Sequence, residues 1–170
     1  VAESAAALMP KSLDFVQAAS IPMVGLTSWQ ALNERAALTQ NQRVFIPAGS
    51  GGIGSFAIQL AKHFGAKVAT TTSSSNVGWV RALGADDVID YTQREFEKVL
   101  FNFDVVLGTI RGDMIEKSVG ILKAGGKIVS LVGPLDADFA RTRRLNFLMT
   151  WVFGLMSRNI KRIANKRDVD

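Results

Sequence analysis

The chain has no cysteine, one histidine and one tyrosine among its 170 residues. Without cysteine, these residues form no disulfide and supply no thiolate to a zinc ion. The one histidine, His63, has no acidic residue at ligand spacing, so we interpret it as a surface side chain. The composition therefore predicts a cytoplasmic protein with no zinc site in these residues.

Long apolar runs are also missing from the sequence. No run reaches the roughly 18 residues that a membrane-spanning helix requires, and no charged start precedes an apolar core and a cleavage site. With 48% apolar residues, the chain can still bury the core of one α/β domain. It begins at Val1 and ends on the charged run 165–170, so we expect a piece of a longer protein without a membrane span.

The net charge of +5 is unevenly distributed along the chain. Residues 141–170 contain eight Arg or Lys and two Asp, whereas residues 1–140 contain twelve Arg or Lys and thirteen Asp or Glu. The apolar block from Leu145 to Met156 lies within this basic part and predicts a basic, helical C-terminal segment. Such a helix can bind an anionic membrane surface or nucleic acid. We favour a third interpretation, in which its apolar face packs on another domain, and expect no nucleic-acid partner.

A glycine-rich stretch between Arg43 and Thr72 carries the clearest signal. An apolar run meets the glycines, a helical pattern follows from Ser55, and a second apolar run opens at Val68, which predicts strand, tight turn, helix and strand. The glycines have the spacing G-x-G-x-x-G of a dinucleotide site, in which they allow the tight turn, the close approach of the pyrophosphate and close helix packing. The helix would direct free N–H groups at the phosphates. The three glycines are Gly49, Gly51 and Gly54.

The end of the second predicted strand bears on the choice of cofactor. An NAD site of this design usually carries Asp or Glu there, about 20 residues past the glycine turn, to bind the ribose hydroxyls. Residues 70–76 are instead three threonines, three serines and an asparagine, whose donors can bind a 2′-phosphate that no carboxylate repels. This favours NADP(H), with Arg81 as the nearest cation, although a polar surface loop would have the same composition. The residues concerned are Thr72, Ser73, Ser74 and Asn76.

The residues before the glycine turn predict two helices. The stretch Ser12-Leu13-Asp14 can cap a short helix that continues over residues 15–19. Ile21-Pro22 breaks this helix, because proline lacks an N–H donor and restricts the residue before it. A second helix runs from about Val24 to Leu38. Thr27 lies at its start, where the hydroxyl either meets a ligand or bonds its own backbone.

After the second strand, helices and strands continue to alternate. The patterns predict strands over 88–91, 103–110 and 127–132, helices over 78–83, 92–101 and 114–122, and a glycine turn over 123–126. Five strands separated by helices predict a doubly wound parallel sheet, the Rossmann fold, with helices on both faces. Ligands of such sheets bind beyond the carboxyl ends of the strands. That rule adds to the glycine turn and the second strand the residues Tyr91, Thr109, Ile110, Val132 and Gly133.

Several segments together resemble the medium-chain dehydrogenase/reductase superfamily, in its zinc-independent quinone oxidoreductase-like branch. They are AASIPMVGLTSWQAL, GSGGIGSFAIQLAK, RALGADDVIDY, FDVVLGTI and ILKAGGKIVSLVG, which cover nearly the whole chain. The resemblance implies that residues 1–20 are the end of a catalytic domain and a linker. Residues 21–170 would be a cofactor domain that stops before its last strand, which commonly builds a homodimer interface in this superfamily.

The resemblance also implies roles for the site residues. Gly49, Ser50, Gly51, Gly52, Ile53 and Gly54 would hold the pyrophosphate, and Ser73, Ser74 and Tyr91 would lie near the 2′-phosphate. Thr109 and Ile110 would line the path of the ribose or nicotinamide, which Thr27, Val132 and Gly133 would approach. The chain departs from the family in two places. Family members often carry a lysine shortly after the second strand, where this chain has Asn76-Val77. Their fourth strand is often followed by an Asp-Thr and paired glycines, where this chain has Gly-Thr-Ile-Arg-Gly over 108–112.

The implied activity is hydride transfer from NADPH to a quinone or an α,β-unsaturated carbonyl. We assign no catalytic residue, since Tyr91 has Glu95 rather than lysine four places on, and expect the polarising groups in the absent domain. A methyltransferase would normally carry an acidic residue at the end of the second strand, which this chain lacks. A non-catalytic nucleotide sensor or a nucleic-acid-binding module that uses the basic segment is the alternative.

Overall fold

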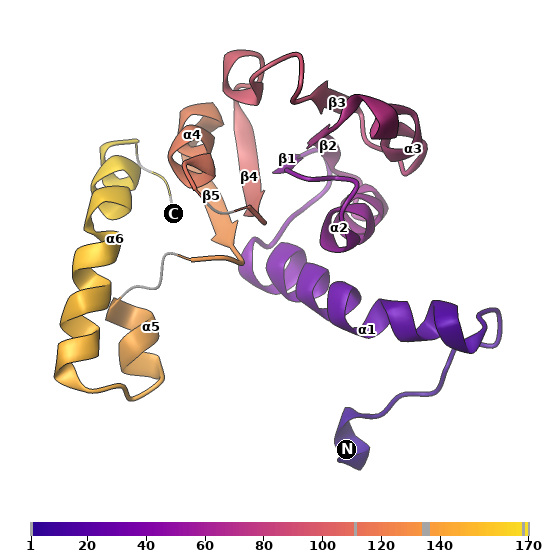
Figure 1. The fold of residues 1–170 in the computed structure, drawn as a ribbon, viewed down its shortest axis with the longest axis horizontal. Helices are drawn as coiled ribbons and strands as arrows, with labels where there is room; N and C mark the ends of the chain where they lie inside the picture. Colours follow the sequence, from indigo (N-terminus) through magenta and orange to yellow (C-terminus); the bar gives the residue numbers. More distant parts are fainter. Residues whose placement is uncertain (1, 111, 134–136, 168, 170) are drawn as a thin grey trace.

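The computed structural model describes residues 2–110, 112–133, 137–167 and 169 (Figure 1). A 3₁₀ turn at Glu3–Ala5 and a π-helical segment at Gln30–Arg35 precede the sheet. Two further 3₁₀ turns, at Ser74–Asn76 and Phe96–Lys98, lie in the connections between its strands. The main elements are α1 (Phe15–Trp29), β1 (Arg43–Ile46), α2 (Gly52–His63), β2 (Lys67–Thr72), α3 (Val77–Ala82), β3 (Asp87–Asp90), β4 (Phe103–Gly108), α4 (Met114–Ile121), β5 (Leu122–Ser130), α5 (Ala137–Thr142) and α6 (Phe147–Arg167).

The five strands form one parallel sheet in the order β3-β2-β1-β4-β5. The chain moves outward from β1 through β2 to β3, then crosses back to place β4 on the other side of β1. Strand order therefore reverses between β1 and β4, and this is where a doubly wound sheet opens a crevice at its carboxyl edge. The five-stranded Rossmann arrangement predicted from the alternating patterns is confirmed.

Alternate residues of the strands supply two apolar layers, one on each face of the sheet. Val44 and Ile46 belong to the layer under α2, whereas Phe45 points to the other face, where its ring stacks on that of Phe96 with 4.7 Å between centroids. Figure 1 shows α2 and α3 on one side of the sheet and α4 on the other. Each face is covered, which explains why residues 44–46 of β1 and 105–107 of β4 are continuously apolar rather than alternating.

The N-terminal helix α1 is longer than the sequence predicts. The Asp14 carboxylate accepts a hydrogen bond from the N–H of Gln17 at 2.8 Å, and the Asp14 N–H donates to Oε1 of Gln17 at 3.1 Å, so the predicted cap is confirmed, with Asp14 as the N-cap residue. The predicted break at Pro22 is wrong, because α1 runs through this proline to Trp29. Pro22 is exposed, so water can bond the carbonyl that its missing N–H leaves free, and packing of Gly25 against Phe56 of α2 holds the next turn in place.

Two later predictions also need correction. The predicted helix over 92–101 is a single 3₁₀ turn, Phe96–Lys98, because the Asp90 carboxylate binds the N–H and hydroxyl of Thr92 and closes a turn in its place. The predicted glycine turn over 123–126 lies inside β5. Leu122 still pairs with Phe103, and the ladder shifts register before Lys127 pairs with Val105, with Gly125 at a φ of +72°.

The C-terminal segment is helical, as predicted, and forms α5 and α6 at the side of the molecule beyond α4 (Figure 1). Phe153 is buried and its ring lies 6.4 Å from that of Phe139. Phe147 and Trp151 are exposed. In the described part of the chain, no helix combines the length and apolarity needed to cross a bilayer.

Candidate functional site

The turn after β1 depends on glycine at two positions. A Cβ on Gly54 would lie 2.2 Å from the carbonyl oxygen of Ala48, and a Cβ on Gly49 would lie 2.3 Å from the hydroxyl oxygen of Thr70. Ala48 itself has a φ of +54°, in the left-handed region. These close approaches bring the backbone of the turn, without side chains, to the carboxyl edge of the sheet.

The neighbouring strand β2 holds this turn in place. The N–H of Gly49 donates to the carbonyl of Thr71 at 2.9 Å, and the N–H of Ala48 donates to the Thr71 hydroxyl at 3.2 Å. The buried hydroxyl of Thr70 donates to the carbonyl of Ile46 at 2.5 Å. The threonines of β2 therefore bond the main chain of β1 and its turn, a role that their composition alone did not reveal.

The glycine turn leads directly into the N-terminus of α2. Gly51 is the N-cap residue and no side chain caps this end. The first intrahelical hydrogen bond runs from the N–H of Ser55 to the carbonyl of Gly51 at 2.8 Å. The N–H groups of Gly52, Ile53 and Gly54 precede it and have no partner within the helix, so this end can receive an anion.

Hydroxyl and amide groups gather at the end of β2. The buried Thr72 hydroxyl donates to the Ser50 hydroxyl of the glycine turn at 3.0 Å. Beyond the strand, the Asn76 amide donates to the Ser73 hydroxyl at 3.1 Å, and the hydroxyls of Ser73 and Ser75 lie 3.4 Å apart. The structure thus brings Ser50 and Thr72 into contact and places Ser73 and Asn76 just past them.

A carboxylate that the sequence interpretation missed joins this group. Asp90 pairs with Thr72 across the β2–β3 ladder, and the Ser74 hydroxyl donates to its Oδ2 at 2.5 Å. The hydroxyls of Ser74 and Thr92 hold the pKa of the Asp90 carboxyl below its usual value. The sequence prediction concerned acidic residues at the end of β2, whereas Asp90 ends the adjacent strand β3. Tyr91 follows with its side chain exposed, although its N–H donates to the Thr72 carbonyl at 3.1 Å.

The ends of β1 and β4 are joined at the point where strand order reverses. The Thr109 hydroxyl donates to the Pro47 carbonyl at 3.1 Å, and Ile110 next to it is half-buried. Residue 111 of the unusual loop over 108–112 lies outside the described residues. Thr109 and the glycine turn therefore flank the crevice from opposite sides.

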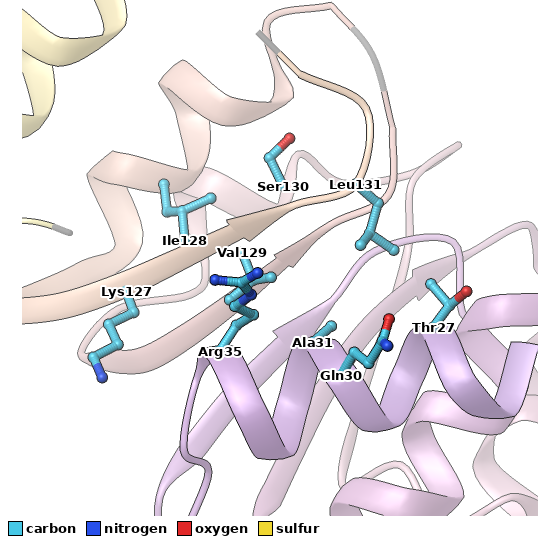
Figure 2. A pocket seen from close by; sticks show the side chains of 9 residues that line it. All are labelled: Thr27, Gln30, Ala31, Arg35, Lys127, Ile128, Val129, Ser130 and Leu131. Carbon is cyan, nitrogen blue, oxygen red and sulfur yellow. The ribbon is translucent and has the colours of Figure 1, made fainter. Parts of the chain in front are cut away.

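Thr27, Val132 and Gly133 lie toward β5. An open cavity of about 570 Å³ separates α1 and the following helical turn from β5, with Thr27 and Leu131 at one end and Arg35 and Lys127 in its wall (Figure 2). Thr27 lies inside α1 rather than at a helix start, and its hydroxyl donates to the carbonyl of Met23 at 2.7 Å, as the backbone alternative anticipated. Figure 2 shows Leu131 directed toward the helix that carries Thr27.

The loop after β5 is tied to the end of β4. The Leu131 N–H donates to the Gly108 carbonyl at 2.8 Å, and the Ser130 hydroxyl donates to the carbonyl of Gly133, whose φ is +101°. Val132 and Gly133 are both half-buried. Their segment is thus placed at the same carboxyl edge as Thr109, whereas the glycine turn does not line the cavity beside β5.

The arrangement fits a dinucleotide better than a metal ion. Bare backbone and a helix N-terminus suit a pyrophosphate, and the hydroxyl and amide cluster at β2 suits the adenosine end. Among the described residues, no group of three or more His, Asp or Glu could hold a metal ion.

Comparison with known proteins gives one family. Residues 52–165 match the family model described as zinc-binding dehydrogenase. The chain is 42% identical over 135 residues to the 2-methylene-furan-3-one reductase of Solanum lycopersicum, and 43% identical over 135 residues to the chloroplastic NADPH-dependent alkenal/one oxidoreductase of Arabidopsis thaliana. Each match covers 78% of this chain and 34% of the relative, so the chain spans about a third of the length of these curated relatives.

Solved structures agree with this result. The quinone oxidoreductase from Coxiella burnetii superposes with a TM-score of 0.72 at 33% identity, over 91% of this chain and 53% of that structure.

Proposed function

This chain belongs to the zinc-binding dehydrogenase family, within the medium-chain dehydrogenase/reductase superfamily, and we propose that it is the NADP(H)-binding domain of an oxidoreductase. The whole protein would transfer a hydride from NADPH to a quinone or an α,β-unsaturated carbonyl. In this proposal residues 1–20 end a catalytic domain and its linker, and residues 21–170 form the cofactor domain. The relatives named as a furanone reductase and an alkenal/one oxidoreductase support this substrate class.

One observation carries the proposal: the 2.2 Å that would separate a Gly54 Cβ from the Ala48 carbonyl oxygen. At this distance no side chain fits, so the turn after β1 and the first turn of helix α2 meet backbone to backbone. No side chain caps α2, so its first N–H groups would be open to a ligand. A pyrophosphate needs this close approach to main-chain donors.

Each site residue then has a distinct task. The N–H groups of residues 52–54 would hold the pyrophosphate, while Ser73 and Asn76 would offer donors to a 2′-phosphate. Thr109 would border the ribose, and Thr27, Val132 and Gly133 would border the nicotinamide. These residues bind and orient, which is the protein's part in a reaction whose hydride the bound nicotinamide supplies.

We further propose that the reaction proceeds without zinc. The proposal follows from the resemblance to the zinc-independent quinone oxidoreductase-like branch. Within the described residues no group of three or more His, Asp or Glu could hold the metal that the family's name implies, so we assign no part of a metal site to them. We assign no general acid or base to this chain. Groups that polarise the carbonyl would come from the catalytic domain.

The proposal is tested by titrating the protein with NADPH, NADH and S-adenosylmethionine, following nicotinamide fluorescence and thermal stability. We expect both nicotinamide cofactors to bind, NADPH more tightly, and S-adenosylmethionine not to bind. A chelator such as EDTA should leave these affinities unchanged. Preferential binding of S-adenosylmethionine, or no binding of either nicotinamide by the intact protein, would refute the proposal.

A further inference from the structure

Three side chains, one from the loop after β2 and two from the end of β3 and the turn that follows it, form a small hydrogen-bonded group at the edge of the β2–β3 pair. Asp90 ends β3, Ser74 follows β2, and Thr92 lies two residues beyond Asp90. Ser74 donates to one carboxylate oxygen at 2.5 Å, and the hydroxyl and N–H of Thr92 donate to the other at 2.7 and 2.9 Å. Both oxygens of Asp90 are thereby engaged.

This pattern fixes which way the hydroxyls can bond. A hydroxyl has one hydrogen to donate. Ser74 and Thr92 both give theirs to Asp90, although their own oxygens lie only 3.2 Å apart. What Ser74 presents outward is therefore an oxygen lone pair, which can accept from a ribose hydroxyl but cannot donate to a phosphate.

The neighbouring hydroxyls behave differently. Ser73 accepts a hydrogen bond from Asn76 at 3.1 Å, and no carboxylate takes its hydrogen in the described contacts. Of the pair Ser73 and Ser75, one hydroxyl keeps a hydrogen for a ligand even if the other donates within the pair. Donors for a 2′-phosphate therefore come from Ser73, Ser75 and Asn76, while Ser74 faces the same region as an acceptor.

The negative charge of Asp90 also disfavours a 2′-phosphate at this edge. The hydroxyls of Ser74 and Thr92 lower the pKa of Asp90, so its carboxylate is ionised at neutral pH. A fixed negative charge beside the adenosine end repels a phosphate dianion but accepts a ribose hydroxyl.

We propose that Asp90 is a specificity-determining residue: by holding the Ser74 hydrogen and its own charge at this edge, it weakens the preference of the site for a 2′-phosphorylated nucleotide. The inference rests on the proposed function. Ser73 and Asn76 attract the 2′-phosphate, and Asp90 opposes them, so the balance between NADPH and NADH depends on a residue of β3 as well as on β2 and its loop.

The test uses two half-ligands that differ by the 2′-phosphate, 2′,5′-ADP and 5′-AMP, titrated calorimetrically into the intact protein. Asp90→Asn keeps the shape and an acceptor for Thr92 but removes the charge. We expect it to raise the ratio of 2′,5′-ADP to 5′-AMP affinity about tenfold, as removal of one like charge can. Asp87→Asn, at the other end of the same strand, is the matched control and should leave the ratio unchanged.

Ser74→Ala gives a second readout that does not depend on the turn after β3. While Asp90 holds its hydrogen, Ser74 offers a ligand only an acceptor, so Ser74→Ala alone should not lower the ratio of 2′,5′-ADP to 5′-AMP affinity. In the Asp90→Asn background the same change should reduce the gain. An unchanged ratio in Asp90→Asn, or a lower ratio in Ser74→Ala alone, overturns the inference and leaves the proposed function standing. Failure of the parent protein to bind either half-ligand and either nicotinamide cofactor overturns both.

Discussion

The hydroxyl of Thr109 donates a hydrogen bond to the carbonyl of Pro47 at 3.1 Å and so joins the end of β4 to the end of β1. These two strands lie on either side of the point where strand order reverses. The bond therefore crosses the crevice in which doubly wound sheets bind their ligands.

Thr109→Val should widen this crevice at little cost to the fold. The hydroxyl is half-buried, and losing one such bond costs about 1 kcal/mol. If Thr109 sets the separation of the two strand ends, NADPH affinity falls roughly fivefold, the equivalent of that energy. Thr150→Val is the control, because Thr150 also bonds a backbone carbonyl, that of Asn146, but in α6. Equal NADPH affinities in the two variants would argue against this role.

Gly54→Ala should damage both the site and the stability of the protein. The new methyl group would meet the Ala48 carbonyl, and backbone on both sides must move, which costs about 2–3 kcal/mol. We expect a lower melting temperature and loss of measurable NADPH binding. Gly78→Ala in α3 has open space around the added Cβ and a helix that favours alanine, so that variant should be as stable as the parent or more so.

Asp86 should make stability depend on pH in the acid range. Burial disfavours its charged form, but the Val68 N–H at 2.7 Å and the Lys62 ammonium at 2.9 Å prevail, so its pKa lies below the ordinary value of 3.8. A depressed folded-state pKa contributes stability above about pH 4, and this is lost as pH falls through the folded pKa.

The measurement is urea unfolding of the parent and Asp86→Asn between pH 7 and pH 3. Water screens the Lys62–Asp86 ion pair, because both side chains are partly exposed. We therefore expect Asp86→Asn to lower the free energy of unfolding by about 1 kcal/mol at pH 7, and by less as the pH falls. The neighbouring Asp87→Asn serves as the control for loss of charge alone. A constant difference between parent and Asp86→Asn across this range would contradict the assignment.

Pro22→Ala should stabilise the protein. Proline inside a helix removes one hydrogen bond and crowds the preceding turn, whereas alanine restores the bond and loses somewhat more entropy on folding. Because Pro22 is exposed within α1, we expect a gain of about 1 kcal/mol in unfolding free energy, measured by chemical denaturation. A loss of stability would mean that the proline ring makes a packing contribution that outweighs the bond.

The sequence predicts those features that are set by residues close together in the chain. A stretch of ten residues is enough to recognise the glycine turn from Gly49 to Gly54 and the apolar runs of β1 and β4, because glycine spacing and strand composition are local. The capping of α1 by Asp14 is likewise local. The family could also be predicted from the sequence, because its motifs occur in this chain in the same order as in the superfamily.

Features that depend on tertiary pairing were missed. Continuation of α1 past Pro22 depends on packing against Phe56, which lies 34 residues further on. Asp90 reaches Ser74 because β2 and β3 pair with Thr72 opposite Asp90, a register that no local pattern encodes. The same carboxylate also closes the turn at Thr92, and this local bond replaced the predicted helix.

The bonds from Gly49 and Ala48 to Thr71 have a kinetic consequence. A turn that is already fixed by its neighbouring strand need not become ordered when a nucleotide arrives, so little conformational entropy is lost at that step. Association would then be limited by encounter rather than by rearrangement of the loop. Differences in affinity between cofactors would appear mainly as differences in how long each one stays bound.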